Sequence, residues 1–141
     1  MPSKGTAQWQ GDLKSGSGTF KAGEDITGSY SFKSRFEDGD GANPEQLIGA
    51  AHAACFSMAL SNALAEAGTP VDSVETTAVV TLRIVDDAPT ITKIELTTVG
   101  RVPGLDEAAF TAAAQDAKEN CPVSKALASV PEMTLDASLA A

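Results

Sequence analysis

The stretch NPEQLIGAAHAACFSMALSNALAEAG, residues 43–68, decides the fold because it reads as one long helix that the rest of the chain surrounds. Asn43 favours a helix start, since its side-chain oxygen can accept from an early unpaired amide, and Pro44 suits the first helical position. Gly68 predicts the end of the helix. Nearly every residue between them is small or apolar, which is typical of a buried helix. We expect it to be too short and too polar to span a membrane.

The length and composition of the chain indicate one soluble domain, residues 1–141, with a core of its own. The net charge of −9 argues against nucleic acid or an anionic membrane as a partner, because both attract basic proteins. The first residues lack the apolar segment of a secretory signal, so we expect a cytoplasmic protein.

Shorter elements flank the central helix on both sides. Residues 71–85 alternate between apolar and polar, and residues 90–102 alternate in the same way after the turn DDAP. The two runs predict an antiparallel hairpin with one exposed face. Other expected strands are 7–13, a strand beginning near 19–21, 26–36 and 133–139, and the other expected helices are 107–119 and 123–128. This order predicts an α+β fold with a largely antiparallel sheet.

Two cysteines carry the functional question. Cys121 precedes Pro122 at an expected helix start, where free amides favour a thiolate. Cys55 lies in the middle of the central helix, where loss of water raises a thiol pKa. Local reasoning therefore favours Cys121 as the reactive thiol, unless a cation reaches Cys55. Two cysteines and one histidine without ligand spacing are too few for a metal site, so none is expected.

Arg35 is the best candidate for that cation, because it precedes the loop that leads into the central helix. Glu45 could orient its guanidinium group, although a solvated arginine and a glutamate at a helix start remain an alternative. Ten residues separate Glu45 from Cys55, which is about 15 Å along one helix. If Arg35 and Glu45 serve Cys55, we therefore expect them to come from a second copy in a two-fold dimer.

His52 lies three residues before Cys55, and a Cys–His pair would suit a hydrolase. No glycine-rich elbow accompanies the pair, so a histidine that makes a packing hydrogen bond is favoured. The residues alone leave open a hydrolase, a non-enzymatic redox sensor, and a structural or binding dimer with an inert cysteine.

Four segments resemble the osmotically inducible protein C (OsmC) family, which includes the organic hydroperoxide resistance (Ohr) proteins. They are residues 43–68, FKSRFEDGDGANPE at 32–45, VPGLD at 102–106 and NCPVSKAL at 120–127. The resemblance runs from about residue 8 to residue 139 and is closer to the OsmC branch than to the Ohr branch. It implies an OsmC-like fold, in which a long buried central helix lies in an intertwined two-fold homodimer with two sites at the interface.

The resemblance also implies a thiol-dependent peroxidase. Cys55 matches the peroxidatic cysteine and Cys121 the resolving one, which overrules the local preference for Cys121, while Arg35 and Glu45 match the pair that activates the thiolate. The expected substrates are organic hydroperoxides and also hydrogen peroxide. Cys55 would become a sulfenic acid and then a disulfide with Cys121, which an external dithiol would reduce. The resemblance implies a dithiol of lipoyl type. No metal, flavin or haem cofactor is implied.

Overall fold

The computed structural model describes all residues, 1–141, and these form two compact units, Met1–Leu47 and Ile48–Ala141. We call them the N-terminal unit and the C-terminal unit. Six strands and four helices confirm the predicted α+β class. That the whole chain behaves as one domain stays a prediction.

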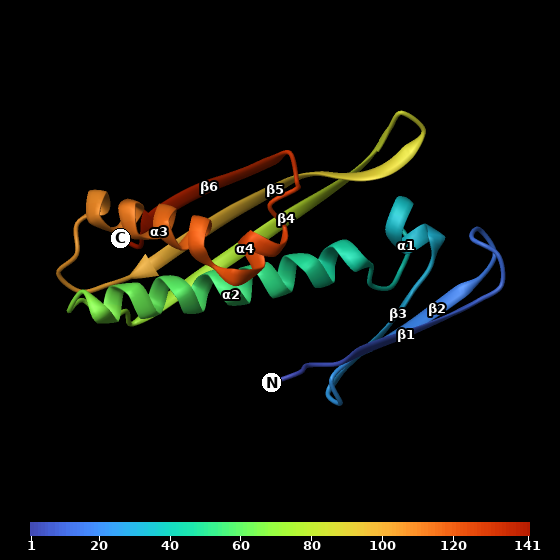
Figure 1. The fold of residues 1–141 in the computed structure, drawn as a ribbon, viewed down its shortest axis with the longest axis horizontal. Helices are drawn as coiled ribbons and strands as arrows, with labels where there is room; N and C mark the ends of the chain where they lie inside the picture. Colours follow the sequence, from blue (N-terminus) through green and yellow to red (C-terminus); the bar gives the residue numbers. More distant parts are fainter. The chain divides into compact units, whose positions relative to one another are not determined.

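The N-terminal unit contains an antiparallel sheet of β1 (Gly5–Gln10), β2 (Ser17–Ala22) and β3 (Ile26–Tyr30), in that order (Figure 1). Its aromatic side chains pack over a glycine. The rings of Trp9 and Tyr30 lie 5.4 Å apart, and a Cβ atom at Gly18 would lie 2.6 Å from the Tyr30 ring and 2.7 Å from the Trp9 ring. Glycine at position 18 therefore allows these two rings to close over β2.

The expected strand over residues 26–36 is wrong in its second half. β3 ends at Tyr30, and Phe32–Phe36 form a short helix, α1. Ser31 and Ser34 form a capping box, in which each side chain accepts from the other residue's amide. The rings of Phe32 and Phe36, whose spacing resembled strand alternation, instead pair one helical turn apart at 4.9 Å.

The helix α2 (Pro44–Glu66) begins in the N-terminal unit and continues through the C-terminal unit. The side chain of Asn43 accepts from the Gln46 amide at 2.9 Å, which confirms the predicted N-cap. The remaining elements are β4 (Ser73–Val85), β5 (Ala88–Arg101), α3 (Glu107–Asn120), α4 (Pro122–Ala126) and β6 (Glu132–Leu139).

The sheet of the C-terminal unit has the order β4-β5-β6 and is mixed. β4 and β5 form the predicted antiparallel hairpin, and β6 pairs with β5 in parallel after the crossover through α3 and α4. The hairpin turns at Asp86 and Asp87, whose φ angles of 51° and 64° are those that a two-residue hairpin loop requires.

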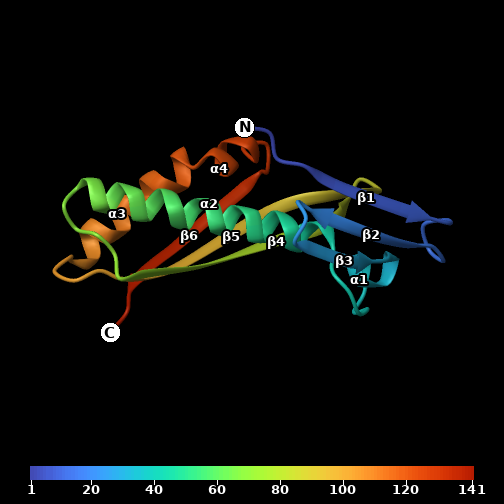
Figure 2. The ribbon, with the colours of Figure 1, turned by 90° about the horizontal axis from the view of Figure 1, so that it is seen from below.

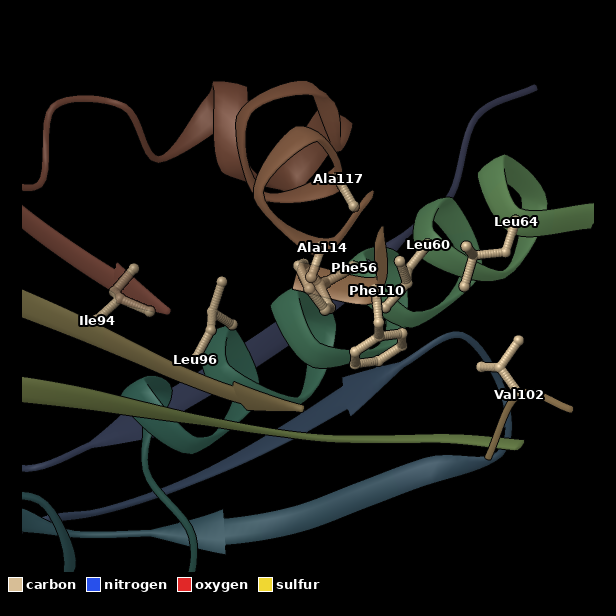
Figure 3. Packing of buried hydrophobic residues seen from close by; sticks show 9 residues of the cluster. All are labelled: Phe56, Leu60, Leu64, Ile94, Leu96, Val102, Phe110, Ala114 and Ala117. Atoms are coloured by element: carbon tan, nitrogen blue, oxygen red, sulfur yellow. The ribbon is translucent and has the colours of Figure 1, made fainter. Parts of the chain in front are cut away.

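The core lies on one face of this sheet, where Phe56 of α2 and Phe110 of α3 meet Ile94 and Leu96 of β5 (Figure 3). All four side chains are buried. Gly100 of β5 admits the Phe110 ring, because a Cβ atom there would lie 2.5 Å from it. The alternation read from the sequence therefore places the correct residues of β5 inward.

α2 is buried along one stripe only, whereas its composition had predicted burial on all sides. The stripe contains Gly49, His52, Phe56, Leu60 and Leu64. Met58, on the opposite side of the helix, is 76% exposed. Within the C-terminal unit, no element covers this side of α2. Figure 2 shows α2 running across β4, β5 and β6, the strands of the C-terminal unit.

The expectation that α2 is too short and too polar for a membrane span is also wrong, since by length and composition alone this 23-residue helix could cross a membrane. The core helices of soluble proteins meet the same criteria. The buried stripe of α2, which packs against the sheet, agrees with such a core role.

Candidate active site

The C-terminal unit brings the two cysteines together. The Sγ atoms of Cys55, in the middle of α2, and Cys121, at the start of α4, lie 3.0 Å apart. Both are free thiols; Cys121 is fully buried and Cys55 is half-buried beside the packed stripe of α2. Cys121 ends α3 and caps α4, and its sulfur accepts from the Ser124 amide at 3.4 Å. The sequence break at Pro122 therefore turns the chain so that this sulfur faces α2.

The surroundings of the two sulfur atoms shift their pKa values in opposite directions. Burial raises the pKa of Cys55, and the neighbouring Cys121 sulfur raises it further. Burial would also raise the pKa of Cys121, but hydrogen bonds from Cys55, from the Ser124 amide and hydroxyl and from the Val123 amide hold it below the ordinary value. Within one chain the net shift disfavours the Cys55 thiolate, so Cys55 needs a positive group to ionise at neutral pH.

The N-terminal unit holds Arg35 against Glu45. The Nε atom of Arg35 donates to both carboxylate oxygens, at 3.1 and 3.3 Å, and its Nη2 atom donates to Oε1 at 2.8 Å. The Glu45 side chain is 8% exposed and that of Arg35 is 34% exposed. The Arg35 guanidinium also lies 5.5 Å from the centre of the Phe36 ring. Two donors on one carboxylate fix the plane of the guanidinium group, which leaves its other N–H groups available.

Hydrogen bonds between α1 and the start of α2 position the two residues of this ion pair. The Ser34 hydroxyl donates to the carbonyl oxygen of Ala42 at 2.7 Å, and the Asn43 side chain donates to the Ser34 carbonyl at 3.0 Å. Asn43 thus caps α2 through its oxygen and holds α1 through its nitrogen. Because Arg35 follows Ser34 directly and Glu45 lies in the first turn of α2, these bonds align the two charged groups.

An apolar cavity of about 300 Å³ adjoins Arg35 within the N-terminal unit. It is lined by Trp9, Leu13, Tyr30, Ser31, Phe32, Arg35 and Phe36. Aromatic walls around one permanent cation suit a small ligand that is apolar at one end and polar at the other. Sequence reasoning missed this cavity.

His52 is fully buried, and its Nε2 atom lies 2.7 Å from the hydroxyl oxygen of Ser124. Its Nδ1 atom has no partner, and burial lowers the pKa of the ring. Neither ring nitrogen bonds Cys55, so the expected packing histidine describes it better than a hydrolase base. Sequence reasoning missed Ser124; its position three residues after Cys121, at the start of a helix, was the available signal.

Comparison with known proteins identifies the family. Residues 37–136 match the family model for OsmC-like proteins. Peroxiredoxin OsmC of Escherichia coli (strain K12) is 50% identical over 138 residues, which cover 96% of this chain and 95% of the relative, and the protein of the same name from Shigella flexneri gives the same values. The chain belongs to the OsmC family.

Solved structures agree with this OsmC-family fold. The organic hydroperoxide resistance protein OsmC of Legionella pneumophila superposes with a TM-score of 0.71 at 22% identity and covers 98% of this chain and 97% of its own. OhrB of Bacillus subtilis superposes with a TM-score of 0.72 at 23% identity and covers 97% and 98%. The resemblance that the sequence motifs indicated is confirmed.

The four predicted site residues of this OsmC-family chain form two pairs, Cys55 with Cys121 and Arg35 with Glu45. Each pair lies within one compact unit, and the pairs belong to different units. The activation of Cys55 by Arg35 therefore stays a prediction. No cluster of three or more His, Cys, Asp or Glu side chains is arranged to hold a metal ion.

Proposed function

We propose that this chain is a thiol-dependent peroxidase that reduces organic hydroperoxides to alcohols, with Cys55 as the peroxidatic and Cys121 as the resolving cysteine. The observation that carries the proposal is the 3.0 Å separation of the two sulfur atoms, in a chain that is 50% identical to a peroxiredoxin over nearly its whole length. Two sulfur atoms this close can form a disulfide with little movement of the backbone.

The reaction runs in two steps. The Cys55 thiolate attacks the distal oxygen of the hydroperoxide, the O–O bond breaks, and the alkoxide leaves and takes up a proton as the alcohol. Cys55 is then a sulfenic acid. The Cys121 thiolate attacks that sulfur, hydroxide leaves and is protonated to water, and a Cys55–Cys121 disulfide remains. An external dithiol, which we expect to be of lipoyl type, reduces this disulfide by exchange.

Arg35 is the proposed activator of Cys55, and Glu45 is the proposed positioning residue for Arg35. A thiol whose pKa is raised by burial and by a neighbouring sulfur ionises at neutral pH only beside a cation. The bidentate Arg35–Glu45 pair holds such a cation at the edge of an aromatic cavity. That cavity would receive the apolar part of an organic hydroperoxide and leave its peroxide group near the guanidinium. Hydrogen peroxide, which has no apolar part, would be the poorer substrate.

We infer that the working form is a homodimer. The exposed face of α2 continues into a shallow groove with the start of β4, lined by Ser57, Met58, Ser61, Asn62, Ala65, Val71 and Val74. A long apolar helix with one uncovered face is suited to a second copy of itself. The ten-residue spacing of Glu45 and Cys55 favours Arg35 and Glu45 of one copy serving Cys55 of the other. Because the cycle needs a reducing dithiol, we place the protein in the cytoplasm.

The test is a peroxide-consumption assay with a dithiol supplied, in which cumene hydroperoxide is compared with hydrogen peroxide. We expect many turnovers for the wild type, none for Cys55→Ser, and a faster reaction with the organic substrate. Thr98→Val, which removes a buried hydroxyl of β5 that bonds Thr76 and neither cysteine, is the matched control. Consumption of only about one equivalent of peroxide per chain would point to a redox sensor and would contradict the proposal.

A further inference from the structure

A buried histidine contacts a buried serine in the same helical turn as Cys121. Neither residue has a role in the steps described above. His52 is 0% exposed and Ser124 is 5% exposed. Their side chains join α2 to α4 through the 2.7 Å contact between Nε2 and Oγ. A buried polar pair needs its hydrogen bonds satisfied, yet the Nδ1 atom of His52 has no partner. This imbalance determines how the protons are arranged.

The hydrogen bond runs from His52 to Ser124. Because burial lowers the pKa of His52, the ring is neutral and carries one N–H. A hydrogen on Nδ1 would be a buried donor without an acceptor, and such donors are rarer in proteins than acceptors without a donor. The hydrogen therefore lies on Nε2 and is donated to the Ser124 oxygen. The hydroxyl hydrogen of Ser124 is then free for another acceptor.

The candidate acceptor is the sulfur of Cys121, three residues earlier in the same helical turn. The backbone amide of Ser124 already donates to Cys121 Sγ at 3.4 Å. The Ser124 hydroxyl, like that amide, lowers the pKa of Cys121. The other titratable group that acts on this sulfur is Cys55, from α2. No charged side chain of α3, α4 or the sheet contributes to that shift.

We propose that His52 and Ser124 are positioning residues for disulfide formation: His52 fixes the Ser124 hydroxyl, which donates a hydrogen bond to the Cys121 thiolate. The proposal rests on the proposed peroxidase function. In the step concerned, the S–O bond of the Cys55 sulfenic acid breaks while the Cys55–Cys121 bond forms. The Cys121 sulfur is oxidised, the Cys55 sulfur is reduced, and the departing hydroxide takes up a proton from the solvent to make water. The Ser124 hydroxyl thus stabilises the Cys121 thiolate that attacks the sulfenic acid.

The test titrates Cys121 alone, in the reduced full-length Cys55→Ser chain, by the ultraviolet absorbance of the thiolate. The same chain with Cys121→Ser gives the background from Tyr30. We expect Ser124→Ala to move the titration to higher pH and Ser124→Thr, which keeps the hydroxyl, to leave it near the parent. His52→Leu should also move it upward, and His52→Gln, whose amide can donate to the same oxygen, should restore it. Thr98→Val, which removes another buried hydroxyl of this unit, should leave the titration of Cys121 unchanged.

Two results would overturn the proposal. One is a Ser124→Ala chain that titrates like its parent; this small change removes no backbone hydrogen bond, so it remains informative even if His52→Leu does not fold. The other is a His52→Leu shift that is as large in the Ser124→Ala background as in the parent, because His52 would then not act through Ser124.

A kinetic measurement uses the chain with both cysteines and one equivalent of hydroperoxide. Ser124→Ala should leave the formation of sulfenic acid unchanged and slow the formation of the disulfide about tenfold, as expected for the loss of a hydrogen bond to a charged group. Equal slowing of both steps would contradict the proposal. The absorbance titration needs no peroxide, so it stays decisive even if the chain proves not to be a peroxidase.

Discussion

The sulfur atoms of Cys55 and Cys121 lie 3.0 Å apart, although 66 residues separate them in the chain. We therefore expect one equivalent of hydroperoxide to convert the reduced protein to a disulfide within one chain. On a denaturing gel without reductant the oxidised protein should migrate as a single chain, and mass spectrometry of its peptides should join residue 55 to residue 121. Cys121→Ser should instead stop at the sulfenic acid, which a dimedone-type probe would label. A disulfide between two chains would contradict this arrangement.

Removal of the Arg35 guanidinium should lower the thiolate fraction of Cys55 at neutral pH. Burial raises the pKa of this thiol, so without Arg35 its thiolate fraction is small at neutral pH and grows as the pH rises. We expect Arg35→Met to lower the rate of peroxide reduction at pH 7 roughly 10- to 100-fold and to make that rate climb steeply toward alkaline pH. Arg35→Lys should recover little, because lysine cannot form the bidentate contact with Glu45.

The control for that measurement is Arg83→Met, which removes an exposed arginine of β4. Its rate and pH profile should match the wild type. If the rate of Arg35→Met rose no more steeply with pH than the rate of this control, Arg35 would not be the group that ionises Cys55.

His52 should make the protein less stable in mild acid. Its folded-state pKa is lowered by burial from the ordinary value of 6.5, so below that pH the unfolded chain binds a proton that the folded chain resists. The free energy of unfolding should therefore fall as the pH drops below about 6.5 and be constant above it, as far as this group is concerned. Urea titrations between about pH 5 and pH 8 would measure the slope. His52→Gln, which cannot titrate, should flatten it; an unchanged slope would assign it to other groups.

The uncovered face of α2 should hold two copies together. Met58 is 76% exposed within one chain and lines the groove beside β4. We expect analytical ultracentrifugation to show a dimer for the wild type and a shift toward monomer for Met58→Glu, because the substitution places a charge on that apolar face. Val99→Glu, at an exposed position of β5, should leave the dimer intact. Peroxidase activity should fall together with dimerisation if the copies share their sites.

Gly49 should tolerate no side chain, even though alanine is the better helix former. A Cβ atom at this position of α2 would lie 2.8 Å from the backbone oxygen of Ala78 in β4, and neither backbone can move without displacing the core. We expect Gly49→Ala to reduce the free energy of unfolding by about 1–3 kcal/mol, measured by urea titration. Stabilisation by the variant would mean that helix propensity outweighs this contact.

Local signals predicted much of the fold. The cap at Asn43 is confirmed by the hydrogen bond from the Gln46 amide, and the alternation in residues 90–102 is confirmed by the burial of Ile94 and Leu96. Such features depend on residues a few positions apart. Where two local signals competed, the reading was wrong: the serine capping box of α1 prevailed over the apparent strand alternation of Phe32 and Phe36.

By itself, the sequence determined which side chains can carry redox chemistry and on which elements they lie, because capping, alternation and helix length are local properties of the chain. Only the tertiary structure decided that Cys121 faces Cys55, that Ser124 joins His52, and that α2 buries a single stripe. These contacts join residues far apart in the chain, and they are set by how helices and strands pack over a shared apolar face. No local pattern encodes that packing.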